Sequence, residues 1–379
     1  MDFRLTAEQK DIKLAAKDFA KGEFDPDAAL GYDKNQQFPS VIWKNACGLG
    51  FIGVHFPETY GGQDCGLMEN ALIIEAFCRQ DSGIGMALAL SDAGSEILLK
   101  YGNDSQKRNV LPLIAEGKDI CTIAFLEKNH SLTPLKTSME AGNDGYIING
   151  EKIFVTLGNL ADYIVVTCQT KYDNPLSQSV MLLEREMPGI AISSMGEKMG
   201  MRTVSTEKIS LHNVVAPEKN IIGQIGSGYT QLQDFLKEMR IKTAAMGIGI
   251  AAGGIDKALE YSKKRWQFDK PIVSFDAIKN KLADMYMETE MARLITYNAA
   301  CSFDAGRPDS KTILMSKIAA TRAAYRVTYE AVQIHGGYGY MTEGHIERFY
   351  RDAKALGLFL ETGQVRRSML ADQITGQAA

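Results

Sequence analysis

The chain has 379 residues, which is typical of two or three domains rather than one core. Apolar residues make up 45% and charged residues 23%, as in globular proteins, and the formal net charge is −4. The sequence has no long basic run, which excludes nucleic acid as the expected partner. The longest apolar run, residues 244–255, is too short to cross a bilayer, and its glycines and alanines predict close helix packing. No signal peptide is evident, so we expect a cytoplasmic protein without a membrane span.

The cysteines and histidines show no metal-binding spacing. Cysteines stand at positions 47, 65, 78, 121, 168 and 301. They form no CxxC pair, and no histidine lies at ligand spacing from them. We therefore expect free thiols in a reducing compartment and no metal site.

The first third of the chain has the pattern of helices. Thr6 and Gln9 have the spacing of a capping box, and apolar residues follow at helical intervals. Residues 56–62 interrupt this pattern as a loop. Helical periodicity then continues over about residues 68–99.

A strand pattern begins near Asp119. Residues 145–156 predict two short strands joined at an Asn149-Gly150 turn. Further strands are predicted at 163–167, 179–183 and 209–214.

Helical periodicity returns after residues 226–228. Apolar residues between 278 and 295 line one helix face, residues 306–308 break the helix, and another helix spans about 310–334. The order of elements predicts an α+β fold, mainly α. We expect an N-terminal helical domain (1–118), a middle β-domain (119–225) and a C-terminal helical bundle (226–379).

Motifs along most of the chain resemble those of acyl-CoA dehydrogenases. Residues 333–340 (Gln-Ile-His-Gly-Gly-Tyr-Gly-Tyr) and 351–354 (Arg-Asp-Ala-Lys) are similar to the family's C-terminal signature. Other matches, in the family's order, are at 57–62, 199–202, 213–217, 265–268 and 282–285. The resemblance implies a helical domain, a β-barrel-like domain and a four-helix bundle. It also implies FAD bound between the last two, an acyl-CoA substrate, a homotetramer, and electron delivery to an electron-transfer flavoprotein.

The resemblance also implies flavin-binding residues. Thr156 matches the threonine at the flavin N5 edge, and Phe154 takes the place of a tryptophan beside the ring. Arg265 and Phe268 match residues that contact the FAD of a neighbouring subunit. The family's cofactor-binding turn is matched by Gln333, Gly336 and Gly337. Thr362 and Gln364 match positions near the adenosine half.

Residues 124–131 depart from the family. A Thr-Glu-Pro-Gly-Ala-Gly-Ser-Asp type loop usually contacts flavin and CoA there, whereas this chain has Ala-Phe-Leu-Glu-Lys-Asn-His-Ser. We therefore expect FAD contacts in this loop to come from the backbone, as at Ile123 and Ala124, or from substitute residues.

The usual catalytic glutamate is missing. Its position falls on Leu360, and the alternative position in some relatives falls on Met239, just before Arg240. Neither side chain accepts a proton, although the Leu360 backbone N–H can still bind the thioester oxygen. Met239 and Arg240 are expected beside the substrate. Glu361 follows one residue late, where a helix or turn would rotate its side chain by about 100° away from the acyl chain.

Asp92 is the preferred candidate base. It interrupts a small and apolar run on a helical segment that lines the acyl pocket in the family. A helix cap or solvated turn is the alternative explanation. Glu361 is kept as the alternative base.

A displaced base predicts a different reaction. Asp92 would remove the γ-proton of an α,β-unsaturated ring thioester, giving 1,4-elimination. The constellation resembles that of cyclohex-1-ene-1-carboxyl-CoA dehydrogenases of anaerobic bacteria, which form cyclohexa-1,5-diene-1-carboxyl-CoA in aromatic degradation. Conventional 2,3-desaturation of another cyclic or branched acyl-CoA, such as cyclohexanecarboxyl-CoA or benzylsuccinyl-CoA, and a silent flavin-binding scaffold remain alternatives.

Overall fold

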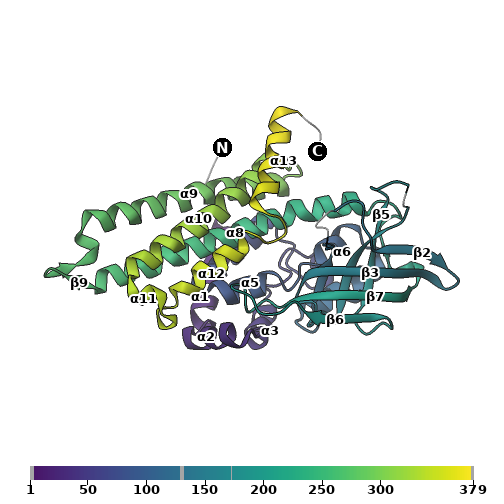
Figure 1. The fold of residues 1–379 in the computed structure, drawn as a ribbon, viewed down its shortest axis with the longest axis horizontal. Helices are drawn as coiled ribbons and strands as arrows, with labels where there is room; N and C mark the ends of the chain where they lie inside the picture. Colours follow the sequence, from purple (N-terminus) through teal and green to yellow (C-terminus); the bar gives the residue numbers. More distant parts are fainter. Residues whose placement is uncertain (1–3, 129–131, 172, 377–379) are drawn as a thin grey trace.

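A computed structural model describes residues 4–128, 132–171 and 173–376 of the chain. It confirms the predicted order of helices, sheet and helices, and therefore the α+β, mainly α, fold class. In Figure 1 the β-sheet lies at one end of the longest axis, and the long helices extend toward the other end.

The N-terminal part consists of helices around an apolar core. They are α1 (Ala7–Glu23), α2 (Pro26–Asn35), α3 (Ser40–Gly48), η1 (Glu58–Tyr60), α4 (Leu67–Gln80), α5 (Ser82–Ala89), α6 (Ser95–Tyr101) and α7 (Asp104–Ala115). The predicted capping box is confirmed: Thr6 Oγ1 accepts from the Gln9 N–H, and Gln9 Oε1 from the Thr6 N–H, both at 3.1 Å. The helical pattern over 68–99 is divided among three helices, because Asp81 caps α5 and residues 90–94 form a turn.

The middle part is an eight-stranded sheet of order β6-β7-β3-β2-β4-β5-β8, with β1 paired in parallel to β4. Its strands are β1 (Cys121–Ala124), β2 (Ser138–Gly142), β3 (Gly145–Thr156), β4 (Tyr163–Gln169), β5 (Gln178–Glu184), β6 (Ile190–Ser194), β7 (Thr206–Ala216) and β8 (Ile221–Ile222), with η2 (Glu218–Asn220) before β8. The strands predicted at 163–167, 179–183 and 209–214 are confirmed as parts of β4, β5 and β7.

The predicted turn at Asn149-Gly150 is wrong, because β3 runs through it as one strand. A register shift against β7 occurs there, and a Cβ on Gly150 would lie 2.6 Å from the Thr137 backbone. The Asn149 side chain accepts a hydrogen bond from the Asn213 N–H at 2.7 Å rather than stabilising a hairpin turn. The hairpin turn lies earlier, where Gly142 pairs with Gly145.

The C-terminal part contains three long helices and shorter ones. They are α8 (Gly228–Lys264), α9 (Asp276–Asp304), α10 (Ser310–His335), α11 (Gly337–Tyr340), α12 (Ile346–Leu356) and α13 (Gly363–Thr375). The strands β9 (Trp266–Gln267) and β10 (Lys270–Pro271), η3 (Ile272–Ser274) and η4 (Thr342–Gly344) connect them. The helix over 310–334 and the break at 306–308 are confirmed.

The apolar run 244–255 lies inside α8 and packs closely, as predicted. A Cβ on Gly249 would lie 2.6 Å from the Glu75 backbone oxygen, and one on Gly253 would lie 2.3 Å from that of Arg79, so α4 and α8 touch through their backbones. Among the described residues, no helix combines the length and apolarity that a membrane span requires.

Candidate active site

The segment at residues 359–362 connects α12 to α13. Leu360 has a left-handed φ of 64°, uncommon for a residue with a side chain, and its side chain packs against the main core. No described residue accepts a hydrogen bond from its backbone N–H. Thr362 caps α13 by accepting from the Val365 N–H at 3.4 Å. The turn therefore leaves a backbone donor without a partner among the described residues, at the position predicted to match the family's glutamate.

Glu361 is held by two buried basic side chains. Its Oε1 accepts from Arg240 Nε at 3.0 Å, and its Oε2 lies 3.8 Å from Lys317 Nζ. Lys317 also donates to the Phe359 carbonyl at 2.8 Å. Burial alone would raise the pKa of Glu361, but Lys317 and Arg240 outweigh burial and lower it. A carboxylate fixed in this way is suited to anchoring the segment rather than to accepting a proton.

Asp92 lies in the turn between α5 and α6, with only 5% of its side chain exposed. The ammonium of Lys242 on α8 is 4.0 Å from its Oδ1. The Asp92 carbonyl accepts from the Ser95 N–H at 2.9 Å, whereas no described backbone N–H donates to its carboxylate. The alternative of a solvated turn is therefore wrong, because Asp92 is buried beside a buried cation.

Asp92 and Glu361 lie on opposite sides of α8. Their partners, Lys242 and Arg240, are two residues apart on this helix. The two side chains therefore leave the helix in directions about 200° apart around its axis. Met239 lies between these directions and is 1% exposed. Both carboxylates therefore flank the apolar side chain at the family's alternative base position.

Backbone contacts connect the Asp92 turn to the candidate flavin residues. Gly94 donates to the Cys121 carbonyl at 2.9 Å, and a Cβ on Gly94 would lie 2.4 Å from the Thr122 carbonyl. Thr122 in turn donates from its hydroxyl to the Thr156 carbonyl at 2.5 Å. Asp92 and Thr156 are thus fixed relative to one another through β1.

The candidate flavin residues of the sheet differ in exposure. Ile123 and Ala124 are buried in β1, where they pair with Val165 and Val166 of β4. Phe154 on β3 is 49% exposed with a positive φ of 53°, and Thr156 at the strand's end is half-buried. An exposed aromatic ring on a strand provides an apolar surface for a planar ligand.

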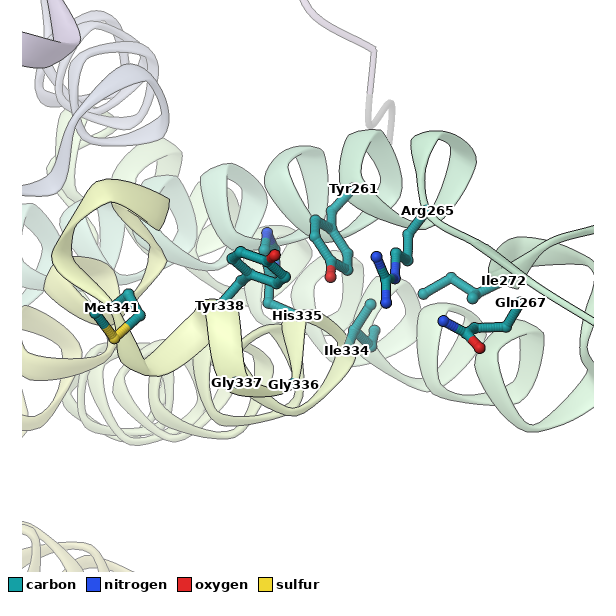
Figure 2. Close-up of a pocket in the computed structure, with 10 residues that line it drawn as sticks. All are labelled: Tyr261, Arg265, Gln267, Ile272, Ile334, His335, Gly336, Gly337, Tyr338 and Met341. Carbon is teal, nitrogen blue, oxygen red and sulfur yellow. The ribbon is translucent and has the colours of Figure 1, made fainter.

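A second group of predicted residues lines a cavity of about 510 Å³ at the end of the bundle (Figure 2). Arg265 follows the last turn of α8, and Gly336 and Gly337 separate α10 from α11. Gly336 has a φ of 60°, and a Cβ on Gly337 would extend into open space. The turn therefore leaves room for a ligand to approach the backbone beside a guanidinium group.

Other predicted residues lie outside that cavity. Phe268 is 85% exposed in the turn between β9 and β10, and Gln333 and Gln364 are exposed on α10 and α13. The cavity also contains Tyr261, whose ring stacks on His335 at 4.4 Å. Tyr261 was not among the predicted residues, although its i,i+4 spacing from Arg265 indicates a shared helix face.

The divergent segment 124–131 is only partly described, because residues 129–131 lie outside the described part of the chain. Within it, Glu127 is buried and pairs with Lys152 at 2.9 Å. Glu127 also accepts from the Thr137 N–H and hydroxyl at 2.9 and 2.7 Å. Glu127 thus stabilises the sheet.

The structure combines a helical domain, a β-sheet and a helical bundle, the order of parts that the family resemblance predicts for a flavin-dependent oxidoreductase. Family models described as the N-terminal, middle and C-terminal domains of acyl-CoA dehydrogenase match residues 6–118, 127–214 and 226–375. A probable acyl-CoA dehydrogenase of Bacillus subtilis (strain 168), YngJ, is 36% identical over 99% of this chain and 100% of its own length.

Solved structures agree with this result. Butyryl-CoA dehydrogenase from Megasphaera elsdenii has a TM-score of 0.94 at 32% identity, over 99% of this chain and 100% of its own. A glutaryl-CoA dehydrogenase bound to glutaryl-CoA has a TM-score of 0.96 at 28% identity, over 100% of this chain and 98% of its own. The chain belongs to the acyl-CoA dehydrogenase family of FAD enzymes, and its similar relatives include proteins named as dehydrogenases and as reductases.

Proposed function

We propose that this enzyme removes a proton and a hydride from a cyclic enoyl-CoA by 1,4-elimination, with Asp92 as the base. The preferred reaction converts cyclohex-1-ene-1-carboxyl-CoA to cyclohexa-1,5-diene-1-carboxyl-CoA. The observation that carries this proposal is the burial of Asp92 beside Lys242, while both usual base positions hold the apolar Leu360 and Met239. The contacts of Glu361 support it further, because Arg240 and Lys317 engage that carboxylate.

The residues present fit FAD. The open space at Gly337 and the neighbouring Arg265 suit a pyrophosphate, and the exposed ring of Phe154 suits the flavin ring. Figure 1 places β9 and α11 far from β3, toward opposite ends of the longest axis. One FAD that uses both groups would therefore join two copies of the chain, which supports an oligomer; the homotetramer is what the family resemblance implies.

Bound FAD supplies the acceptor for the hydride. The chain's own residues would orient the thioester and take the proton. The Leu360 N–H is free among the described residues to donate to the thioester oxygen, which stabilises charge that develops there. Asp92 would accept the γ-proton, which is acidic because of conjugation with the thioester. Met239 and Leu360 would provide apolar surface for the ring.

The physiological setting follows from this reaction. A cyclic dienoyl thioester belongs to anaerobic aromatic degradation, and the reduced enzyme would pass electrons to an electron-transfer flavoprotein in the cytoplasm.

Anaerobic mixing with CoA thioesters tests the reaction. We expect cyclohex-1-ene-1-carboxyl-CoA to bleach the flavin, and straight-chain substrates to bleach it little. Asp92→Asn should retain FAD while losing turnover by about 10²–10⁴-fold, the usual contribution of a general base. Fast bleaching by butyryl-CoA or octanoyl-CoA would contradict the proposed substrate. An active Asp92→Asn variant would contradict the proposed base.

A further inference from the structure

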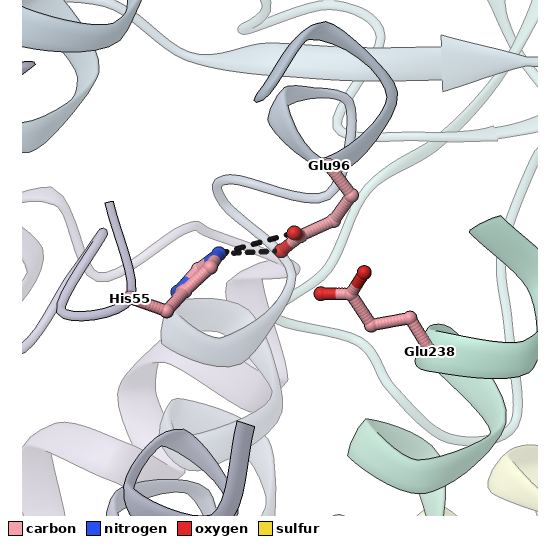
Figure 3. A group of neighbouring side chains, drawn as sticks. All are labelled: His55, Glu96 and Glu238. Carbon is pink, nitrogen blue, oxygen red and sulfur yellow. Dashed lines mark hydrogen bonds and ion pairs between the residues drawn. The ribbon is translucent and has the colours of Figure 1, made fainter. Parts of the chain in front are cut away.

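A buried group of ionisable side chains lies behind Asp92. It contains His55 in the loop before η1, Glu96 on α6, and Glu238 and Lys242 on α8. Figure 3 shows the side chains of His55 and Glu238 pointing toward Glu96. Glu96 and Lys242 form a direct ion pair, with 2% and 1% of their side chains exposed. None of these four residues was predicted from the sequence to belong to the site.

Lys242 approaches Asp92 without bonding to it. Its Nζ lies 4.0 Å from Asp92 Oδ1, beyond hydrogen-bond distance, while the same ammonium donates directly to Glu96 Oε1. No described residue donates a hydrogen bond to the Asp92 carboxylate. Glu361 is the opposite case, since Arg240 donates to it directly. Asp92 thus has a counter-charge nearby while its oxygen lone pairs stay free.

We propose that Lys242 and Glu96 are positioning residues for the base: Lys242 keeps Asp92 ionised in its buried turn, and Glu96 holds the ammonium away from the Asp92 lone pairs. This proposal rests on the proposed function, in which Asp92 takes the substrate's proton. A buried carboxylate needs a nearby cation to stay charged, but a direct hydrogen bond from that cation would compete with the proton that the base must accept. The observed arrangement provides the charge without the bond.

Three donors fix the Glu96 carboxylate. Besides Lys242, His55 Nε2 lies 2.9 Å from Glu96 Oε1 and 3.1 Å from Oε2. An ionised carboxylate can only accept, so Nε2 carries the hydrogen, and Asn70 Nδ2 donates to the other ring nitrogen, Nδ1, at 3.0 Å. Glu238 is the third donor, because burial raises its pKa well above the usual range and Glu96 raises it further. Glu96 is therefore held in place as a carboxylate.

Lys242 and Glu96 remain charged as a pair. Burial alone would lower the pKa of Lys242, but Asp92 and Glu96 outweigh burial and raise it. Burial alone would raise the pKa of Glu96, but His55 and Lys242 outweigh burial and lower it. Both shifts oppose proton transfer between the two side chains, so the ammonium is a fixed charge beside Asp92.

The other titratable groups that face Asp92 are neutral. They are Glu238, which is protonated, and the thiols of Cys47 on α3 and Cys121 on β1. Burial raises the pKa of Cys47 to about 12 and that of Cys121 even further. Among the described residues, Lys242 is therefore the one cation within ion-pair distance of the Asp92 carboxylate.

The pH dependence of proton abstraction tests both roles. The FAD-loaded enzyme is mixed anaerobically with saturating cyclohex-1-ene-1-carboxyl-CoA, and the first-turnover rate of flavin bleaching is measured against pH. In Lys242→Met, Asp92 loses its counter-charge and is harder to ionise, so the acidic limb of the profile should move up by about one pH unit or more.

Glu96→Gln should have the opposite effect on the acidic limb. Without the Glu96 charge, the ammonium can bond directly to Asp92, which makes that carboxylate a weaker base. The limb should therefore move down, and the plateau rate should fall by about tenfold or more. Opposite shifts of the limb distinguish these roles from a general loss of structure.

Matched variants complete the design. Lys237→Met removes another lysine of α8 that forms an ion pair, with Asp234 at 2.9 Å, and should behave as the parent. The double variant Glu96→Gln/Lys242→Met removes both charges of the buried pair and provides a second test if a single variant folds poorly. Its limb should also move up, because Asp92 again lacks a cation.

The outcomes separate the positioning roles from the proposed function. A parent-like profile in Lys242→Met, in Glu96→Gln and in the double variant would overturn the positioning roles. So would a shift of the limb in the same direction in both single variants. No bleaching in the parent, or unchanged bleaching in Asp92→Asn, would overturn the proposed function instead.

Discussion

Arg240 donates from Nε to Glu361 Oε1 at 3.0 Å, and both side chains are almost fully buried. This ion pair joins the middle of α8 to the segment between α12 and α13. Because Lys317 on α10 also approaches Glu361, one carboxylate connects three helical elements around Leu360. The only acidic residue in the 359–362 segment is thus engaged in structure.

Glu361→Gln should therefore reduce stability more than it affects chemistry. The substitution leaves the buried Arg240 guanidinium without its counter-charge, at a cost of about 2–4 kcal/mol. We expect a lower denaturation midpoint, with first-turnover flavin bleaching retained by the variant that still folds. Glu343→Gln, at an exposed position, is the matched control and should change the midpoint little. Loss of bleaching at full stability would instead identify Glu361 as the base.

The pH dependence of stability provides a second measurement on the same variant. The pKa of Glu361 is lowered in the folded state from an ordinary value of 4.5. Its contribution is therefore present above pH 4.5 and is lost as the pH falls through the folded-state pKa. The stability difference between parent and Glu361→Gln should be largest near neutral pH and shrink in acid. A difference that grows in acid would contradict the cited direction of the shift.

Leu360→Glu should introduce the family's usual base. The new carboxylate would arise at the matched position, and its left-handed backbone is already tolerated by a residue with a side chain. We expect some 2,3-desaturation of a saturated acyl-CoA, detected as the enoyl-CoA product, where the parent gives little. Leu360→Gln is the control, because it has similar size and cannot act as a base. A variant that binds FAD and shows no gain would weaken the alignment of this segment.

Much of the fold follows from local patterns in the sequence. The capping box at Thr6 and the helix end at Gly336 depend on neighbouring residues, and both are found in the structure. The Asn149-Gly150 dipeptide has the same local signal as a hairpin turn, but pairing with β7 and the close approach of Thr137 decide its conformation. Long-range pairing therefore overrides a turn signal that is correct in isolation.

The candidate site also contains residues that the sequence alone identifies and residues that only the fold brings together. Leu360 and Met239 could be identified from alignment with a known motif, because each occupies a defined position along the chain. Lys242 and Glu96 could not, since their ion pair joins residues 146 apart in sequence. Only the packing of α6 against α8 brings those charges together behind Asp92.

Gly337→Val tests the cavity at the end of the bundle. A Cβ at Gly337 meets no atom within 4 Å, so the valine would occupy the space that the proposed FAD contact needs without colliding with the protein. We expect a lower ratio of bound FAD to protein, measured by absorbance after gel filtration, with little change in helix content by circular dichroism. Gly22→Val is the matched control, because Gly22 also has open space around it but lies on α1, at an exposed position. Full FAD occupancy in Gly337→Val would show that the cofactor does not use this turn, and would remove the main support for a flavin site shared between two copies of the chain.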